Sequence, residues 1–76
     1  MPQLKPVPFS KFESFLFYIG CKFVRQKGSH RSYQRAGLNR PIIVPYRKEI
    51  PVYIIKNTLR NLGMSTDNFL VIIDKL

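Results

Sequence analysis

The chain is predicted to form one small α+β domain, with its elements in the order α-β-β-β-α-α. Its 76 residues leave no room for a second domain, and a hydrophobic content of 45% favours a globular fold over disorder. Apolar residues recur at helical spacing near both ends of the chain. Three short segments with the features of strands, separated by turn residues, fill the middle.

The first helix is expected to begin at Ser10, after an extended, proline-rich lead-in over residues 1–9. Ser10 and Glu13 fit a capping box, in which the serine caps a helix amide and the glutamate reaches back. Gly20 is suited to end the helix in a left-handed conformation. The apolar stripe of this helix comprises Phe12, Phe15, Leu16 and Ile19. Residues 10–76 are therefore assigned to a single domain.

Three short strands are expected next, over residues 22–27, 29–35 and 41–44. Gly28 supplies the turn between the first two strands, and residues 36–40 read as a loop. Strands joined by such short connections must run antiparallel. Because the helical stripes need a cover, we expect a three-stranded antiparallel sheet with the helices packed on one face.

Two more helices are expected after a polar, basic connector over residues 45–49. Pro51 suits the first turn of the second helix, and Gly63 follows that helix as a stop. Ser65 is placed to cap the third helix. The two apolar stripes comprise Ile55, Thr58, Leu59 and Leu62 in the second helix, and Phe69, Ile72, Ile73 and Leu76 in the third.

The charge of the chain predicts a polyanionic partner. Thirteen Lys and Arg residues against four Asp and Glu give a net charge of +9, which suits nucleic acid or an anionic membrane surface. No expected helix joins a lysine-rich face to a broad apolar face, so a membrane surface is disfavoured. No segment approaches the roughly 18 apolar residues of a membrane span, and the N-terminus lacks the pattern of a signal peptide. We therefore expect a cytoplasmic protein.

The single cysteine, Cys21, cannot form an internal disulfide, which fits a reducing compartment. It lies at an expected helix-to-strand junction, where a buried structural thiol is favoured over a nucleophile. One histidine, one cysteine and no carboxylate cluster do not make a metal site of ordinary type. Neither a metal nor another cofactor is expected.

The chain has one histidine, His30, within the stretch RQKGSHRSY. Side chains alternate between the faces of a strand, so Tyr33 and Arg31 share one face and His30 lies on the other. Tyr33 is large and partly apolar, so its face should pack on the helices and leave His30 on the open face. Arg31 fits the packed face poorly, and this register requires its head group to reach water from near the end of the strand.

An exposed histidine suits proton transfer, because an ordinary imidazole titrates at a pKa of about 6.5. A base that removes the proton of an RNA 2′-hydroxyl lets that oxygen attack the adjacent phosphorus. Cations nearby would stabilise the charge on the phosphoryl oxygens. From the residues alone, an inert or merely phosphate-contacting His30 stays open, as does a non-catalytic module that grips RNA by its shape. The candidate RNA-binding residues are Lys22, Arg25, Lys27, Ser29, Arg47 and Lys48.

Several segments match the pattern of a known family. They are Gly28-Ser29-His30 followed by Tyr33, the lead-in Gly20-Cys21-Lys22-Phe23-Val24-Arg25-Gln26-Lys27, the pair Val44-Pro45, and Ile55-Lys56-Asn57-Thr58-Leu59-Arg60-Asn61-Leu62-Gly63-Met64-Ser65. Over residues 12–69 the chain resembles the HicA (YcfA-like) toxins of bacterial toxin–antitoxin systems. It departs from their pattern at Arg31, and Pro45-Tyr46-Arg47 lacks a second histidine.

The resemblance implies a fold similar to a double-stranded-RNA-binding domain. It also implies a ribosome-independent mRNA interferase, an endoribonuclease that cleaves single-stranded mRNA with His30 as its catalytic group. The implied partner is a HicB-type antitoxin that shields this histidine. DNA would be bound only indirectly, at the operator of the pair, through the antitoxin.

Overall fold

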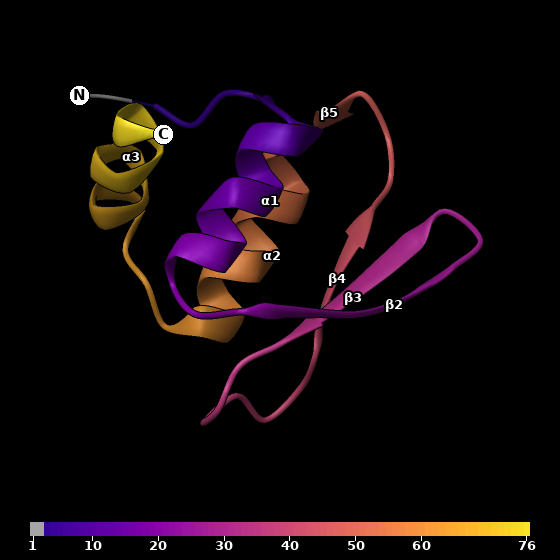
Figure 1. The fold of residues 1–76 in the computed structure, drawn as a ribbon. Coiled ribbons are helices and arrows are strands. Elements are labelled where there is room, and N and C mark those ends of the chain that lie inside the picture. Colours follow the sequence, from indigo (N-terminus) through magenta and orange to yellow (C-terminus); the bar gives the residue numbers. More distant parts are fainter. Residues whose placement is uncertain (1–2) are drawn as a thin grey trace.

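The computed structural model describes residues 3–76 and confirms the predicted α+β order (Figure 1). Two additional strands of two residues each lie before the first helix and before the second. The elements are β1 (Val7–Pro8), α1 (Phe9–Tyr18), β2 (Lys22–Lys27), β3 (His30–Gln34), β4 (Ile42–Pro45), β5 (Glu49–Ile50), α2 (Val52–Leu62) and α3 (Thr66–Lys75).

The main sheet has the strand order β2-β3-β4 and is antiparallel throughout, as predicted. The short strands β1 and β5 pair separately. The helices gather on one side, whereas the β2–β3 hairpin projects past them into solvent (Figure 1). Gly28 has a φ of 60° at the first position of the hairpin turn, which favours glycine in a two-residue turn of type II′.

The register of β2 contains an irregularity that simple alternation does not predict. Phe23 lies opposite Tyr33, whereas Arg25 lies opposite Ser32, so Val24 is an extra residue in this strand. Directly opposed residues of an antiparallel pair share a face. Phe23 therefore faces the helices with Tyr33, and the shift turns Arg25 to the other face.

The core lies between the helices and the face of the sheet that carries Tyr33, as predicted. Phe15 of α1 packs edge-on against Phe69 of α3, with ring centroids 4.7 Å apart. Along β4, Ile42 and Val44 are buried whereas Ile43 between them is 45% exposed. One face of the sheet is thus covered and the other is open. The largest fully buried side chains are Tyr33, Phe12, Phe15, Phe69, Leu16, Ile50, Ile55 and Val44.

The predicted capping box of the first helix is wrong. Helix α1 begins at Phe9, one residue early, and Pro8 stands at its N-cap without a side-chain cap. The amide of Phe9 donates to the carbonyl of Lys48 at 3.1 Å, so tertiary pairing supplies the partner. Ser10 lies inside the first turn, and the Glu13 side chain is directed to the sheet.

The ends of the later helices agree better with prediction. Gly63 ends α2 in the left-handed conformation, with a φ of 68°, and the Ser65 hydroxyl accepts from the amide of Asn68 at 3.1 Å. Pro51 stands at the N-cap of α2, just before the first turn where it was expected. None of the three helices described is long and apolar enough to cross a membrane.

Cys21 is a buried structural thiol, as predicted. It is only 4% exposed and is not in a disulfide. Burial raises the pKa of the Cys21 thiol, and the nearby Arg35 charge only opposes this effect. A thiol that stays protonated and covered is a weak nucleophile.

Candidate active site

His30 is the first residue of β3 and lies exposed on the open face of the sheet, as the alternation predicts. It is opposite Lys27 of β2 on one side and Pro45 of β4 on the other. These three residues therefore form one row across the sheet. His30 is therefore exposed and directly across the hairpin from a lysine.

Two further rows place more of the candidate residues on the same face. Arg25 lies opposite Ser32, in the row next to His30, so it is a diagonal neighbour at about 7–8 Å between backbones. Lys22 lies opposite Gln34 at the far end of the hairpin. Arg25 and Lys27 are thus brought close to His30, and Lys22 is not.

The remaining candidates gather at the end of the sheet near His30. The Ser29 carbonyl accepts from the amide of Tyr46 at 2.6 Å, which holds the connector after β4 against the hairpin turn. Arg47 and Lys48 are exposed in that connector. The Ser29 side chain is exposed at the turn, and the two basic residues extend the cationic surface beyond Pro45.

The open face carries basic side chains and no acidic ones among the residues described. Glu13 points to the covered face, Glu49 belongs to β5, and Asp67 and Asp74 lie in α3. A phosphate at His30 would therefore meet attraction without a carboxylate nearby to repel it.

Arg31 is accommodated on the Tyr33 face by partners within the protein, and not by reaching water from the strand end as the register required. Its side chain is 20% exposed, and its Nη2 pairs with Glu13 Oε2 at 3.0 Å. Its Nε donates to Tyr33 Oη at 3.1 Å, and its Nη1 donates to Gln26 Oε1 at 2.8 Å. The Tyr33 hydroxyl in turn donates to Glu13. The guanidinium is satisfied on the covered face.

Three aromatic rings complete the surroundings of Arg31. Its guanidinium carbon lies 4.2 Å from the ring centroid of Phe23, 5.5 Å from that of Tyr46 and 5.6 Å from that of Phe9. We call this group the Arg31 clamp; its members are Arg31, Glu13, Tyr33, Gln26, Phe9, Phe23 and Tyr46. The clamp joins α1, both strands of the hairpin and the connector.

The clamp holds the strand that carries His30, the neighbour of Arg31 in the chain. Sequence reasoning assigned Tyr33 to the core but missed the rest of this network. One signal was present, because Glu13 is the only acidic residue before Glu49. A single carboxylate facing many cations is a natural partner for a basic residue that must turn toward the core.

A comparison with protein-family models decides the identity of the chain. The model for the HicA toxin of bacterial toxin–antitoxin systems matches residues 9–64.

The chain belongs to the HicA toxin family.

The match covers α1, the whole main sheet and α2, and it ends before α3. Membership makes the chain a toxin of the toxin–antitoxin kind, with an antitoxin as its partner. A search of curated proteins finds no match. Within residues 3–76 of this HicA-family chain, no three His, Cys, Asp or Glu side chains gather as metal ligands would.

Because Tyr33 is part of the Arg31 clamp, we expect the folded protein to lose stability at high pH. Burial, reinforced by the hydrogen bond to Glu13, raises the pKa of Tyr33 to about 12. An unfolded tyrosine ionises near pH 10, so above that pH the unfolded state loses a proton that the folded state keeps. The stabilisation is complete below about pH 10 and disappears as the pH approaches 12.

The measurement is urea unfolding at intervals from pH 8 to pH 11.5, for the wild type and for Tyr33→Phe. The phenylalanine variant lacks this ionisation, so its stability should fall less steeply over the same range. Identical slopes for the two proteins would show that Tyr33 does not titrate differently in the folded state.

Proposed function

We propose that this HicA-family chain is an mRNA interferase, an endoribonuclease that cleaves single-stranded mRNA without a metal ion. His30 acts as its general acid or base. The observation that carries this proposal is the exposed His30 beside Lys27, on a sheet face whose charged residues are all basic. The family supports a toxin, and the face supports a ligand with phosphate groups.

The proposed step uses the nucleophile that RNA itself carries. His30 takes the proton of a 2′-hydroxyl, and the oxygen forms a bond to the adjacent phosphorus. The bond from phosphorus to the 5′-oxygen breaks, that oxygen takes a proton from water, and the hydroxide that remains removes the proton from His30. Lys27 and Arg25 stabilise the charge on the non-bridging oxygens. The products are a 2′,3′-cyclic phosphate and a 5′-hydroxyl.

The remaining candidate residues have binding roles in this proposal. Lys22, Arg47 and Lys48 hold phosphates away from the cleaved bond, and the exposed Ser29 contacts the RNA beside it. The antitoxin is of the HicB type and covers His30, and the pair reaches DNA only through the antitoxin. Because its substrate is mRNA, the toxin acts in the cytoplasm.

A non-catalytic RNA-binding module is the alternative. The open face of the sheet, which carries no acidic side chain among the residues described, favours this alternative equally. Such a face binds phosphates whether or not the RNA is then cleaved. The proposed cleavage needs the 2′-hydroxyl of the RNA as its nucleophile, whereas binding alone does not.

The test uses one long single-stranded RNA, the same RNA carrying 2′-O-methyl groups, and DNA of the same sequence, all with EDTA present. We expect cleavage of the unmodified RNA alone, with 2′,3′-cyclic phosphate ends, and binding of all three. Cleavage of the methylated strand would refute the proposed step. Salt-sensitive binding without any cleavage would establish the alternative.

A further inference from the structure

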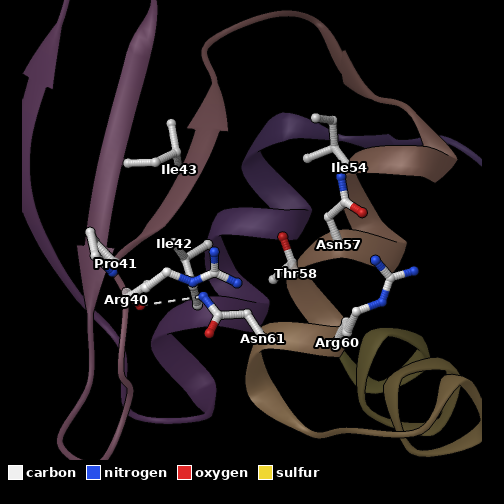
Figure 2. A pocket seen from close by; sticks show the side chains of 9 residues that line it. All are labelled: Arg40, Pro41, Ile42, Ile43, Ile54, Asn57, Thr58, Arg60 and Asn61. Atoms are coloured by element: carbon white, nitrogen blue, oxygen red, sulfur yellow. Dashed lines mark hydrogen bonds between the residues drawn. The ribbon is translucent and has the colours of Figure 1, made fainter.

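A groove runs between β4 and α2, along the edge of the main sheet (Figure 2). Asn61 of α2 donates from Nδ2 to the carbonyl of Arg40 at 3.3 Å, which ties the helix to the β3–β4 loop at one end of the groove. Ile42 and Thr58 form its buried floor. The groove is therefore built from a strand edge and a helix that a hydrogen bond holds in place.

The lining of the groove combines aliphatic surface with cations. Ile43 and Ile54 present apolar surface, and the exposed Arg40 and Arg60 carry positive charge. Asn57 adds an exposed amide, which both donates and accepts hydrogen bonds. None of the lining residues is acidic. This chemistry suits an anionic ligand that also has flat apolar surface.

The groove continues from the candidate active site. Ile43 lies opposite Ser32 on the open face and is a diagonal neighbour of His30, at about 7–8 Å between backbones. It is also the residue through which the open face meets the groove. A strand lying across β3 at His30 and directed over β4 would enter the groove next.

We propose that this groove binds the single-stranded RNA on one side of the bond cleaved at His30. Arg40 and Arg60 contact phosphates, bases lie on Ile43 and Ile54, and Asn57 contacts base edges. This inference rests on the proposed function, because the path of the RNA into the groove is inferred from cleavage at His30. An acidic peptide is less suited, since it would use the arginines but not the continuity with His30.

The test measures RNA binding in the His30→Ala background, so that cleavage does not interfere. The variant is Arg40→Ala with Arg60→Ala. The matched control is Lys56→Ala with Lys75→Ala, which removes the same charge from exposed positions of α2 and α3 outside the groove. Each protein is titrated with a single-stranded RNA of about 12 nucleotides at several salt concentrations.

We expect the groove variant to bind roughly tenfold more weakly at low salt than the control. Its slope of log K against log salt should be smaller by about 1.4, since each phosphate contact on a single strand contributes about 0.7. As a second measurement, RNA should shift the methyl signals of Ile43 and Ile54, while that of Val71 on α3 stays unchanged. These signals decide the question if the double variant does not fold.

Equal binding by the groove variant and the control would overturn the inference, as would methyl shifts that leave out Ile54. Loss of antitoxin binding with unchanged RNA binding would also overturn it and assign the groove to the antitoxin. Failure of the proposed function would give a different result. If wild type does not cut RNA but the groove variant still binds weakly, the groove stands as an RNA site and catalysis does not.

Discussion

Replacing His30 by alanine is expected to slow RNA cleavage by about 10²–10⁴-fold, the usual contribution of one positioned acid or base. The melting temperature should stay close to that of the wild type, because an exposed side chain contributes little to stability. His30 is the only histidine in the chain, so no second imidazole is present to replace it.

The measurement is single-turnover cleavage of one RNA with EDTA, together with thermal unfolding. His30→Gln is the closer variant, since glutamine keeps a polar side chain but does not exchange protons near neutral pH. Gln34→Ala is the matched control, because Gln34 lies on the same face at the other end of β3. It should cleave at nearly the wild-type rate.

Two results would contradict a catalytic His30. Cleavage by His30→Ala within a few-fold of wild type would remove the group from the mechanism. Unfolding or aggregation of His30→Ala, with Gln34→Ala intact, would show a structural role. If His30→Ala loses cleavage but still binds RNA, His30 acts in the reaction and not in RNA binding, as proposed.

Glu13→Ala is expected to lower the free energy of unfolding by about 1–2 kcal/mol, because it removes one partner from each of two partly buried polar groups. The Tyr33 hydroxyl, on a side chain that is fully buried, loses its acceptor, and Arg31 loses its carboxylate. A domain of about 70–80 residues has only a few kcal/mol of stability in total. The loss should therefore be a measurable part of the total stability.

Urea unfolding at pH 7 measures this effect. Ser14→Ala, at the exposed next position of α1, is the control and should change stability by less than about 0.5 kcal/mol. Tyr33→Phe should cost less than Glu13→Ala, because it removes the hydroxyl but keeps the ion pair of Arg31 with Glu13. Equal stabilities of Glu13→Ala and Ser14→Ala would mean that the Glu13 carboxylate contributes nothing to the clamp.

The order of the elements was predictable because it depends on local patterns. The stripe through Phe12 and Phe15 predicts α1, and Gly28 between two short strands predicts the hairpin. Ser65 caps α3 as its residue type suggests. In each case the interaction that decides the structure joins residues a few positions apart.

The errors occurred where distant residues compete for a side chain. Glu13 was expected to cap its own helix, but it serves Tyr33, which is 20 positions away, and Arg31. A local capping bond at the surface is worth about 1 kcal/mol, whereas the long-range position lets the one carboxylate accept from the Tyr33 hydroxyl and pair with Arg31 at the same time. The long-range pairing is therefore favoured.

The sequence by itself determined the helices, the antiparallel strands and the open face of His30, since helical and strand periodicity are properties of neighbouring residues. Only the tertiary structure decided the bulge that turns Arg25 toward His30, the Arg31 clamp and the groove between β4 and α2. Each of these depends on register and packing between segments far apart in the chain. Such contacts follow from how the elements fit together, and periodicity carries no information about that fit.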